Sequence, residues 1–306
     1  MSKHIYTVTI GIPAYNEAAN IGYLLHEILG QTQEGFKIDK IVISSDNSTD
    51  STKQIVEGFN TDLIEFIDNQ NRKGQAFRQN QIIQQCKSDI LILLNADISI
   101  KGPLFIKDLI DPIIHDGADL TSSNMLCIQP SSFFERVLYS GFITRNDMFE
   151  AYHEGNNLYT CHGAARAFSK RMYSSFTFKN SVGEDGYSYL YCMFNKLSYK
   201  YARHATALVK LPDTIKDHEK QSIRFLISKN EWAKEFGEAF VDIHRKLPLN
   251  LVLIKSLVAI TRYPLFALCY MFVLLYMVLK SKFTSPMSQT WESSASSKRL
   301  HSQTQS

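Results

Sequence analysis

The chain is poor in the residues that mark several large protein classes. Glycine and proline supply only 14 and 8 of its 306 residues, which excludes a collagen-like or low-complexity chain. Its five cysteines are odd in number and include no Cys-x-x-Cys pair, so we expect neither a disulfide-rich scaffold nor a paired-cysteine zinc site. Reduced thiols and a cytosolic setting fit this cysteine usage best.

An excess of either charge is also missing. The 33 Lys and Arg residues nearly balance the 30 Asp and Glu residues, leaving a net charge of +3. A protein that binds nucleic acid through many phosphate contacts needs a larger basic excess, so we expect no nucleic-acid partner. The Gly-x-x-x-x-Gly-Lys-Ser/Thr phosphate loop and the Gly-x-Gly-x-x-Gly dinucleotide fingerprint are absent as well. Any nucleotide must therefore be held by another device.

Strand and helix patterns alternate over the first hundred residues. Residues 8–12 alternate as a strand does, and the apolar residues of 21–29 recur at the spacing of an amphipathic helix. The same patterns predict strands at 41–43, 63–67 and 90–94 and helices at 49–59 and 75–86. They predict an α/β fold with a mostly parallel sheet and helices on both faces. Ligands of such sheets bind beyond the carboxyl ends of the strands.

Polar residues follow two of these strands. Ser45 to Asp50 come after the second strand, and Asn95-Ala96-Asp97 come after the fourth. Helix capping explains the later members of the first group as well as ligand binding does. Asp97 has no helix start beside it to cap, and a carboxylate at this position suits Mg²⁺ or Mn²⁺.

A basic loop, Asn71 to Ala76, leads into the helix predicted at 75–86. Its cations and the free N–H groups of a helix start suit a diphosphate. A solvated charged loop is the alternative, and it is the favoured interpretation for Arg78.

The motifs, and the order in which they follow one another along the chain, resemble those of a family 2 glycosyltransferase with the GT-A fold. Residues 12–17 match the opening motif of that family, and 45–50 look like its DDGSTD loop. The remaining matches are Asn71–Gly74 for NxGKG, Asn95–Asp97 for DxD, Gly183–Asp185 for the ED motif and Gln221–Phe225 for QxxRW. Together they cover roughly residues 5 to 225.

The resemblance implies a donor site. Asp46 would hold the nucleobase, because a carboxylate can accept a hydrogen bond from a uracil imide. Asp97 would bind the Mn²⁺ or Mg²⁺ that bridges the donor diphosphate, and His218 would complete the metal site, with a surface histidine as the alternative. The further donor-binding residues that it implies are Pro13, Tyr15, Glu17, Lys73 and Asn95.

Proton transfer would fall to the carboxylate pair Glu184-Asp185. We expect Asp185 to be the base and Glu184 to support it, although a helix N-terminus would also favour carboxylates here. One base suits an inverting displacement, in which the acceptor hydroxyl loses its proton as it attacks the anomeric carbon.

The acceptor side is predicted from two further segments. In His162–Arg166, Gly163 would permit close backbone approach and Arg166 could contact phosphate, with an ordinary glycine turn as the alternative. Gln221 and Arg224 belong to the QxxRW-like motif and would also face the acceptor or a phosphate.

Three positions depart from the family pattern. Ser45 and Asn95 stand where aspartates are usual, which removes two negative charges from the donor site. Phe225 replaces the tryptophan of a motif associated with processive synthases. The chain also lacks the several membrane spans of such enzymes, so we expect the transfer of a single sugar.

Residues 263–279 contain no charged residue. As a helix they would reach about 25 Å, near the short limit for a hydrocarbon core of about 30 Å. An interfacial helix followed by a span, a re-entrant hairpin bent at Pro264, and a buried soluble helix all remain open. The predicted division is a GT-A domain at 1–225, an amphipathic interfacial region at 226–262, a transmembrane or re-entrant helix at 263–281 and a disordered tail at 282–306.

The sequence thus predicts a membrane-attached, metal-dependent, inverting glycosyltransferase on the cytoplasmic face. The donor would be a nucleotide sugar, with a UDP-sugar expected first. The acceptor would lie at the membrane, as a polyprenyl phosphate, a lipid-linked saccharide or a glycolipid precursor. A catalytically degenerate GT-A scaffold that binds nucleotide or a partner is the alternative, and a sugar nucleotidyltransferase is disfavoured because the first loop is not glycine-rich.

Overall fold

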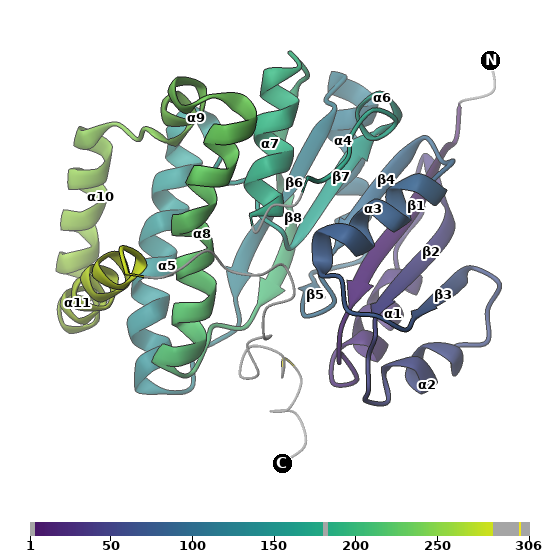
Figure 1. Cartoon of the computed structure of the whole chain (residues 1–306), viewed down its shortest axis with the longest axis horizontal. Coiled ribbons are helices and arrows are strands. Elements are labelled where there is room, and N and C mark those ends of the chain that lie inside the picture. The colour runs from purple at the N-terminus through teal and green to yellow at the C-terminus, as the bar shows by residue number, and fades with distance from the viewer. Residues whose placement is uncertain (1–3, 180–182, 284–299, 301–306) are drawn as a thin grey trace.

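The protein is built on one eight-stranded sheet, seen in a computed structural model that describes residues 4–179, 183–283 and 300. Its strands lie in the order β3-β2-β1-β4-β7-β6-β8-β5 (Figure 1). Their bounds are β1 Tyr6–Ala14, β2 Phe36–Asp46, β3 Ile64–Asn69, β4 Ile90–Leu94, β5 Ser99–Ile100, β6 Leu120–Cys127, β7 Ala165–Ser169 and β8 Tyr199–Val209.

The helices follow the strands in alternation and then gather at the end of the chain. They are α1 Ile21–Leu29, α2 Thr52–Glu57, α3 Gln75–Gln85, α4 Phe105–Asp116, α5 Phe133–Ala151, α6 Lys170–Tyr173, α7 Glu184–Phe194, α8 Ile215–Phe236, α9 Glu238–Arg245, α10 Leu249–Arg262 and α11 Pro264–Ser281. All the strands and helices predicted before residue 95 are present in the predicted order. The largest differences are β2, which is longer than the predicted strand at 41–43, and α2, which is shorter than the predicted helix at 49–59.

The sheet is mixed rather than mostly parallel. β1 pairs in parallel with β2 and β4, and β2 pairs in parallel with β3, as predicted for these four strands. β7 runs antiparallel to both β4 and β6. This direction places the start of β7 beside the end of β4, with Ala165 opposite Leu94. The loop before β7 therefore lies at the edge of the sheet where ligands are expected.

Strand β4 shows why the core has two halves. Its five residues are all buried, and successive side chains of a strand point to opposite faces. Ile90, Ile92 and Leu94 join one apolar cluster, whereas Leu91 and Leu93 join the other. Each fully buried side chain of this size contributes roughly 1.5–3 kcal/mol.

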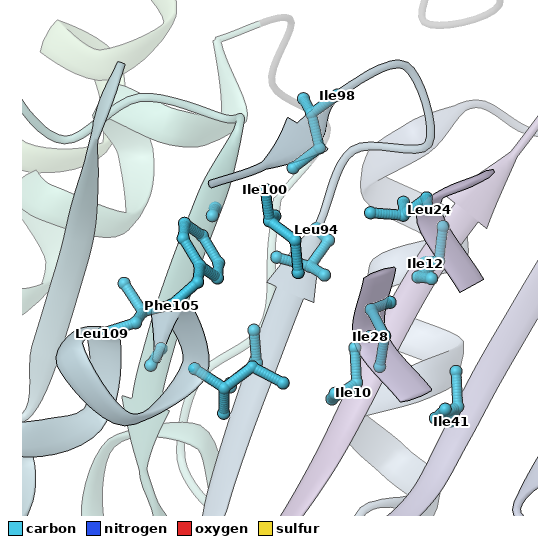
Figure 2. Close-up of a cluster of buried hydrophobic side chains, with 14 of the residues drawn as sticks. Ile10, Ile12, Leu24, Ile28, Ile41, Leu94, Ile98, Ile100, Phe105 and Leu109 are labelled. Atoms are coloured by element: carbon cyan, nitrogen blue, oxygen red, sulfur yellow. The ribbon is translucent and has the colours of Figure 1, made fainter. Parts of the chain in front are cut away.

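Helices cover both faces of the sheet, as predicted. Figure 2 shows the first cluster, in which α1 and α4 pack on the sheet through residues that include Leu24, Ile28, Phe105 and Leu109. The second cluster contains buried residues of α3 and α7, among them Ile82 and Leu190.

The C-terminal helices stand beside the sheet with α5 (Figure 1). α8 runs without a break across residue 225, where the sequence had suggested a domain boundary. α10 ends at Arg262 and α11 begins at Pro264, because the residue before a proline is driven out of helical geometry. Apart from 282, 283 and 300, the predicted disordered tail lies outside the described residues.

Among the described helices, α11 alone is long and apolar enough to cross a membrane by length and composition. Only 11% of its 18-residue window is buried. It is therefore not the buried helix of a soluble core.

Candidate active site

A cavity of about 750 Å³ opens at the carboxyl ends of β1, β2 and β4, between the sheet and helices α5, α7 and α8. Twelve of the fourteen predicted site residues line it. These are Pro13, Tyr15, Glu17, Asp46, Asn95, Asp97, Gly163, Glu184, Asp185, His218, Gln221 and Arg224. The two others, Lys73 and Arg166, lie outside the lining.

Asp46, the last residue of β2, is held by the basic loop. Its carboxylate accepts hydrogen bonds from the backbone N–H groups of Lys73 at 2.8 Å and Gly74 at 3.0 Å. It also accepts one from Nε of Arg78 at 2.8 Å. The interpretation of Arg78 as a solvated cation is wrong, because only 2% of this residue is exposed. Gly74 has a φ of 89°, which a residue with a side chain rarely adopts.

Arg72 faces the cavity in place of the predicted Lys73. Its guanidinium carbon lies 3.7 Å from the centre of the Tyr15 ring, within the range of a cation–π contact. The ammonium of Lys73 lies 4.4 Å from the centre of the Phe77 ring, on the exposed side of the loop. The motif indicated this basic loop but named the wrong cation. The hydrogen bonds from the backbone of Lys73 and Gly74 to Asp46 fix the loop so that Arg72 points inward.

The loops after β1 and β2 are tied together by short polar side chains. The hydroxyl of Ser48 accepts a hydrogen bond from the backbone N–H of Asn16 at 3.1 Å. The carboxylate of Asp50 accepts from the N–H of Ala18 at 3.0 Å and from that of Thr52 at 3.0 Å. Both residues therefore join the two loops, and Asp50 also caps the first N–H of α2. Neither of them lines the cavity.

A second group of polar residues surrounds Gly163. Asn95 accepts a hydrogen bond from Nε2 of Gln75 at 2.8 Å, and its backbone N–H donates to the carbonyl of Ala164 at 3.0 Å. A Cβ atom at Gly163 would lie 3.4 Å from Oε1 of Glu184 and 3.6 Å from Nδ2 of Asn95. The glycine thus leaves open the space between the donor-side amide and the carboxylate pair.

The carboxylate pair stands at the start of α7. Glu184 is buried, and this burial, with the charge of Asp185, raises the pKa of Glu184, while Arg224 opposes the shift. Nη2 of Arg224 lies 3.9 Å from Oε2 of Glu184. Asp185 is half-buried, and its Oδ1 accepts a hydrogen bond from the N–H of Gly186 at 2.7 Å. The two neighbours therefore have different environments.

Arg166 supports this helix start from behind. It is completely buried, and its Nη1 donates to the carbonyl of Glu184 at 3.0 Å and to the hydroxyl of Ser188 at 2.9 Å. The structure does not support the predicted phosphate contact, because the antiparallel strand β7 directs this side chain under α7 and away from the cavity.

The predicted metal residues, Asp97 and His218, line the same cavity. Burial, helped by the charge of Arg145, lowers the pKa of His218 to about 4, so the imidazole is neutral at neutral pH. Its Nε2 lies 3.2 Å from the hydroxyl of Ser222. Within residues 4–179 and 183–283, no three His, Cys, Asp or Glu side chains form a group that could hold a metal. A carboxylate and a neutral imidazole fit a cation that takes further ligands from a bound diphosphate.

Sequence reasoning missed two parts of the lining. His162 lies in the Gly163 loop, and burial lowers its pKa to about 4. The far end of the cavity is apolar, and the residues that form it come from α5, α10 and α11. They include Leu138, Phe142, Val252, Tyr270, Leu274 and Met277. No local signal in the sequence places α11 against this cavity.

Comparison with known proteins agrees with the geometry. Residues 9–176 match the family described as Glycosyl transferase family 2. Glycosyltransferase AglE of Haloferax volcanii is 28% identical over 144 residues, which are 46% of this chain and 47% of that protein. The 4,4'-diaponeurosporenoate glycosyltransferase of Staphylococcus aureus is 26% identical over 138 residues, 44% of this chain and 34% of that protein. The match thus spans about half of the first relative and a third of the second.

Two solved structures share the fold over most of the chain. The mannosyltransferase PcManGT from Pyrobaculum calidifontis, in complex with GDP-Man and Mn²⁺, has a TM-score of 0.58 at 15% identity, over 92% of this chain and 77% of that one. TarS 1-349 of S. aureus has a TM-score of 0.55 at 16% identity, over 84% and 72% of the two chains. Because the family match at residues 9–176 covers more than half of the sequence, the chain belongs to glycosyl transferase family 2, and its fold is of the GT-A type.

Proposed function

We propose that the protein is an inverting glycosyltransferase that moves one sugar from a nucleotide sugar, a UDP-sugar first, to an acceptor at the membrane. The observation that carries this proposal is the convergence of Asp46, Asp97 and Asp185 on one cavity at the carboxyl ends of the strands. Family membership and the fold shared with PcManGT, whose structure contains GDP-Man and Mn²⁺, support it.

The donor would lie along β1, β2 and β4. Tyr15 and the Arg72 guanidinium stacked on it form a flat, cationic wall beside Asp46. Asp97 and His218 would hold the Mn²⁺ or Mg²⁺. When bound, the metal would offset the negative charge that develops on the departing diphosphate. Neutral His218 needs no deprotonation before it binds a metal at neutral pH.

Asp185 would act as the base. It is less buried than Glu184, whose raised pKa makes ionisation of that side chain less favourable. The acceptor hydroxyl would give its proton to Asp185 while its oxygen bonds to the anomeric carbon. The bond from that carbon to the diphosphate would break on the opposite side, and the diphosphate would leave with the electron pair. Arg166 would keep Glu184 and Asp185 in place through its bond to the Glu184 carbonyl.

The acceptor would occupy the apolar end of the cavity. Phe142 of α5 and Leu274 of α11 line this end, while Arg145 and Lys210 line the same cavity and could pair with an anionic group. An amphiphile with a polar head and an apolar chain matches this lining. A polyprenyl phosphate, a lipid-linked saccharide and a glycolipid precursor all have this character. The five free cysteines among the described residues are compatible with the cytoplasmic face of a membrane.

Release of nucleotide from UDP-, GDP- and dTDP-sugars tests the proposal, with detergent-purified protein, Mn²⁺ and membrane lipids. Asp97→Asn should abolish release. Asp185→Asn should slow release by about a hundredfold or more and leave donor affinity largely intact. Asp116→Asn, an exposed carboxylate on α4, is the matched control and should behave as wild type. Full activity of both cavity variants would refute the site.

A non-catalytic scaffold is the second candidate, and two contacts favour it. Ser45 donates its hydroxyl to Ser48 at 3.1 Å, and Asn95 accepts from Gln75, so the two positions without the usual aspartate are already bonded within the protein. Calorimetry with UDP and Mn²⁺, combined with the nucleotide-release assay, distinguishes the enzyme from the scaffold. Binding without release from any donor would favour the scaffold.

A further inference from the structure

The helices α10 and α11 expose many large apolar side chains, which together we call the apolar face. None of the residues of α10 is buried, although all of them belong to the described part of the chain. On α11, Phe272 is 72% exposed. The apolar face consists of Leu249, Leu253, Ile254, Leu257, Val258, Leu265, Leu268, Met271, Phe272, Leu275 and Leu279. A soluble monomer rarely exposes an apolar patch larger than a few hundred Å².

The opposite side of α11 packs on the catalytic domain along almost its whole length. Near its start, the Phe266 ring lies 5.6 Å from that of Phe133 on α5. One turn later, the Tyr270 ring fills the space above Gly141, where any Cβ atom would collide with it. At its end, Nζ of Lys280 pairs with Glu219 of α8 at 2.7 Å. These contacts run over fifteen residues, from Phe266 to Lys280, which is about 21 Å of helix.

This packing favours a helix that does not cross the bilayer. Two ionisable side chains of the catalytic domain lie against α11: the Arg145 guanidinium of α5, 5.8 Å from the centre of the Tyr270 ring, and Glu219 of α8, paired with Lys280. If α11 spanned the hydrocarbon while keeping its contacts, it would carry these ionisable side chains to membrane depth, where such groups are costly. An arrangement in which α11 lies along the surface keeps the contacts and leaves α8 in water.

Both helices can lie in one plane. Figure 1 shows α10 and α11 at the same side of the molecule, outside α5 and α8, with α11 seen nearly along its axis and α10 crossing the view. Residues 246–283 contain five Lys and Arg residues and no Asp or Glu. Basic residues beside an apolar face suit an interfacial helix on an anionic leaflet.

We propose that α10 and α11 lie flat in one leaflet of an anionic phospholipid bilayer, with the apolar face in the acyl region and no segment of α11 crossing the membrane. This inference deepens the proposed membrane attachment and rests on it. It replaces the span and the re-entrant hairpin that the sequence suggested. Because Tyr270, Leu274 and Met277 of α11 line the cavity that also contains Asp185, this placement would bring the acceptor end of the cavity to the leaflet.

Three tryptophan variants measure the depth of α11 directly. Leu265, Phe272 and Leu279 are spaced by seven residues, so they lie on one side of the helix, and all three are at least half exposed. Leu265→Trp, Phe272→Trp and Leu279→Trp are each mixed with phosphatidylglycerol vesicles that carry bromine near either end of the acyl chain. The signal of the native tryptophans, Trp232 and Trp291, is subtracted.

An in-plane helix predicts that the three variants are quenched alike, and more by the shallow bromines than by the deep ones. A span predicts the deepest quenching at Phe272→Trp and shallow quenching at both ends, and that pattern would overturn the proposal. Absence of quenching in all three variants would also overturn it, as would a lipid-free dimer that protects the apolar face. The measurement needs no donor, so loss of transferase activity leaves its outcome unchanged.

Charge variants on the apolar face give an independent readout. Leu257→Glu and Phe272→Glu should reduce vesicle binding at least tenfold, without a change in circular dichroism, because both side chains are exposed. Ile5→Glu is the matched control, since Ile5 is 62% exposed and directly precedes β1, on the other side of the molecule in Figure 1. The protein should bind anionic vesicles more tightly than zwitterionic ones, by a factor of roughly five for each basic residue that faces the leaflet. Equal binding to the two vesicle types would contradict the choice of an anionic leaflet.

Discussion

The pairing of Asp46 with Arg78 offers a quantitative test of what this carboxylate, which we propose for the donor site, does. The two residues are 5% and 2% exposed, and their ion pair closes the basic loop over β2. Asp46→Asn would leave the guanidinium buried without a counter-charge, which costs about 3–5 kcal/mol. Arg78→Met would leave the carboxylate with the N–H groups of Lys73 and Gly74, so we expect a smaller loss, about 1.5–3 kcal/mol for the charged hydrogen bond.

The double variant Asp46→Asn/Arg78→Met removes both charges together. We expect it to be more stable than the sum of the single losses predicts, by a coupling of about 1–3 kcal/mol. Urea unfolding followed by circular dichroism measures the four free energies, and UDP titration of the same proteins measures donor affinity. The reasoning would be refuted if the stability losses of the two single variants added up to that of the double variant. It would also be refuted if Asp46→Asn were as stable as wild type but had lost its affinity for UDP. In the second case Asp46 would serve the nucleobase alone.

Three further predictions concern residues that line the cavity. Glu184→Gln should be more stable than wild type, by a margin that widens as pH rises above the ordinary glutamate pKa. Because the pKa of Glu184 is raised in the folded state, the wild type loses stability as this side chain ionises, and the glutamine variant does not. Equal pH profiles of the two proteins in urea unfolding would contradict this. Gly186→Ala should destabilise the protein by about 1–3 kcal/mol, since its Cβ would collide with the completely buried Trp232 ring, and an unchanged unfolding midpoint would show that the ring can yield. His218→Ala should raise the Mn²⁺ concentration needed for half-maximal activity about tenfold or more, and an unchanged metal dependence would remove His218 from the metal site.

The strand and helix assignments before residue 95 show how much a local pattern decides. In β4 the run of five apolar residues is buried on both faces, and in α1 the three- and four-residue spacing coincides with its four buried positions. Most of the candidate residues chosen from the motifs line one cavity, because parallel strands bring their carboxyl ends to one edge whatever the sequence distance between them.

Tertiary contacts decided the rest. Asp46 and Arg78 are 32 residues apart, and nothing in either segment indicates that the carboxylate binds this cation rather than facing only the ligand. Arg166 is directed under α7 because β7 enters the sheet antiparallel, a choice of direction that depends on its neighbours β4 and β6.

By itself, the sequence determined the alternating α/β elements, the polar edge of the sheet and the apolar character of residues 263–279, because these depend on periodicity and residue type within short windows. Only the tertiary structure decided which cations face the cavity, that α11 forms part of its wall, and that one side of this helix is occupied by α5 and α8. These outcomes depend on side chains that meet across long stretches of sequence, such as Tyr270 on Gly141 and Lys280 on Glu219.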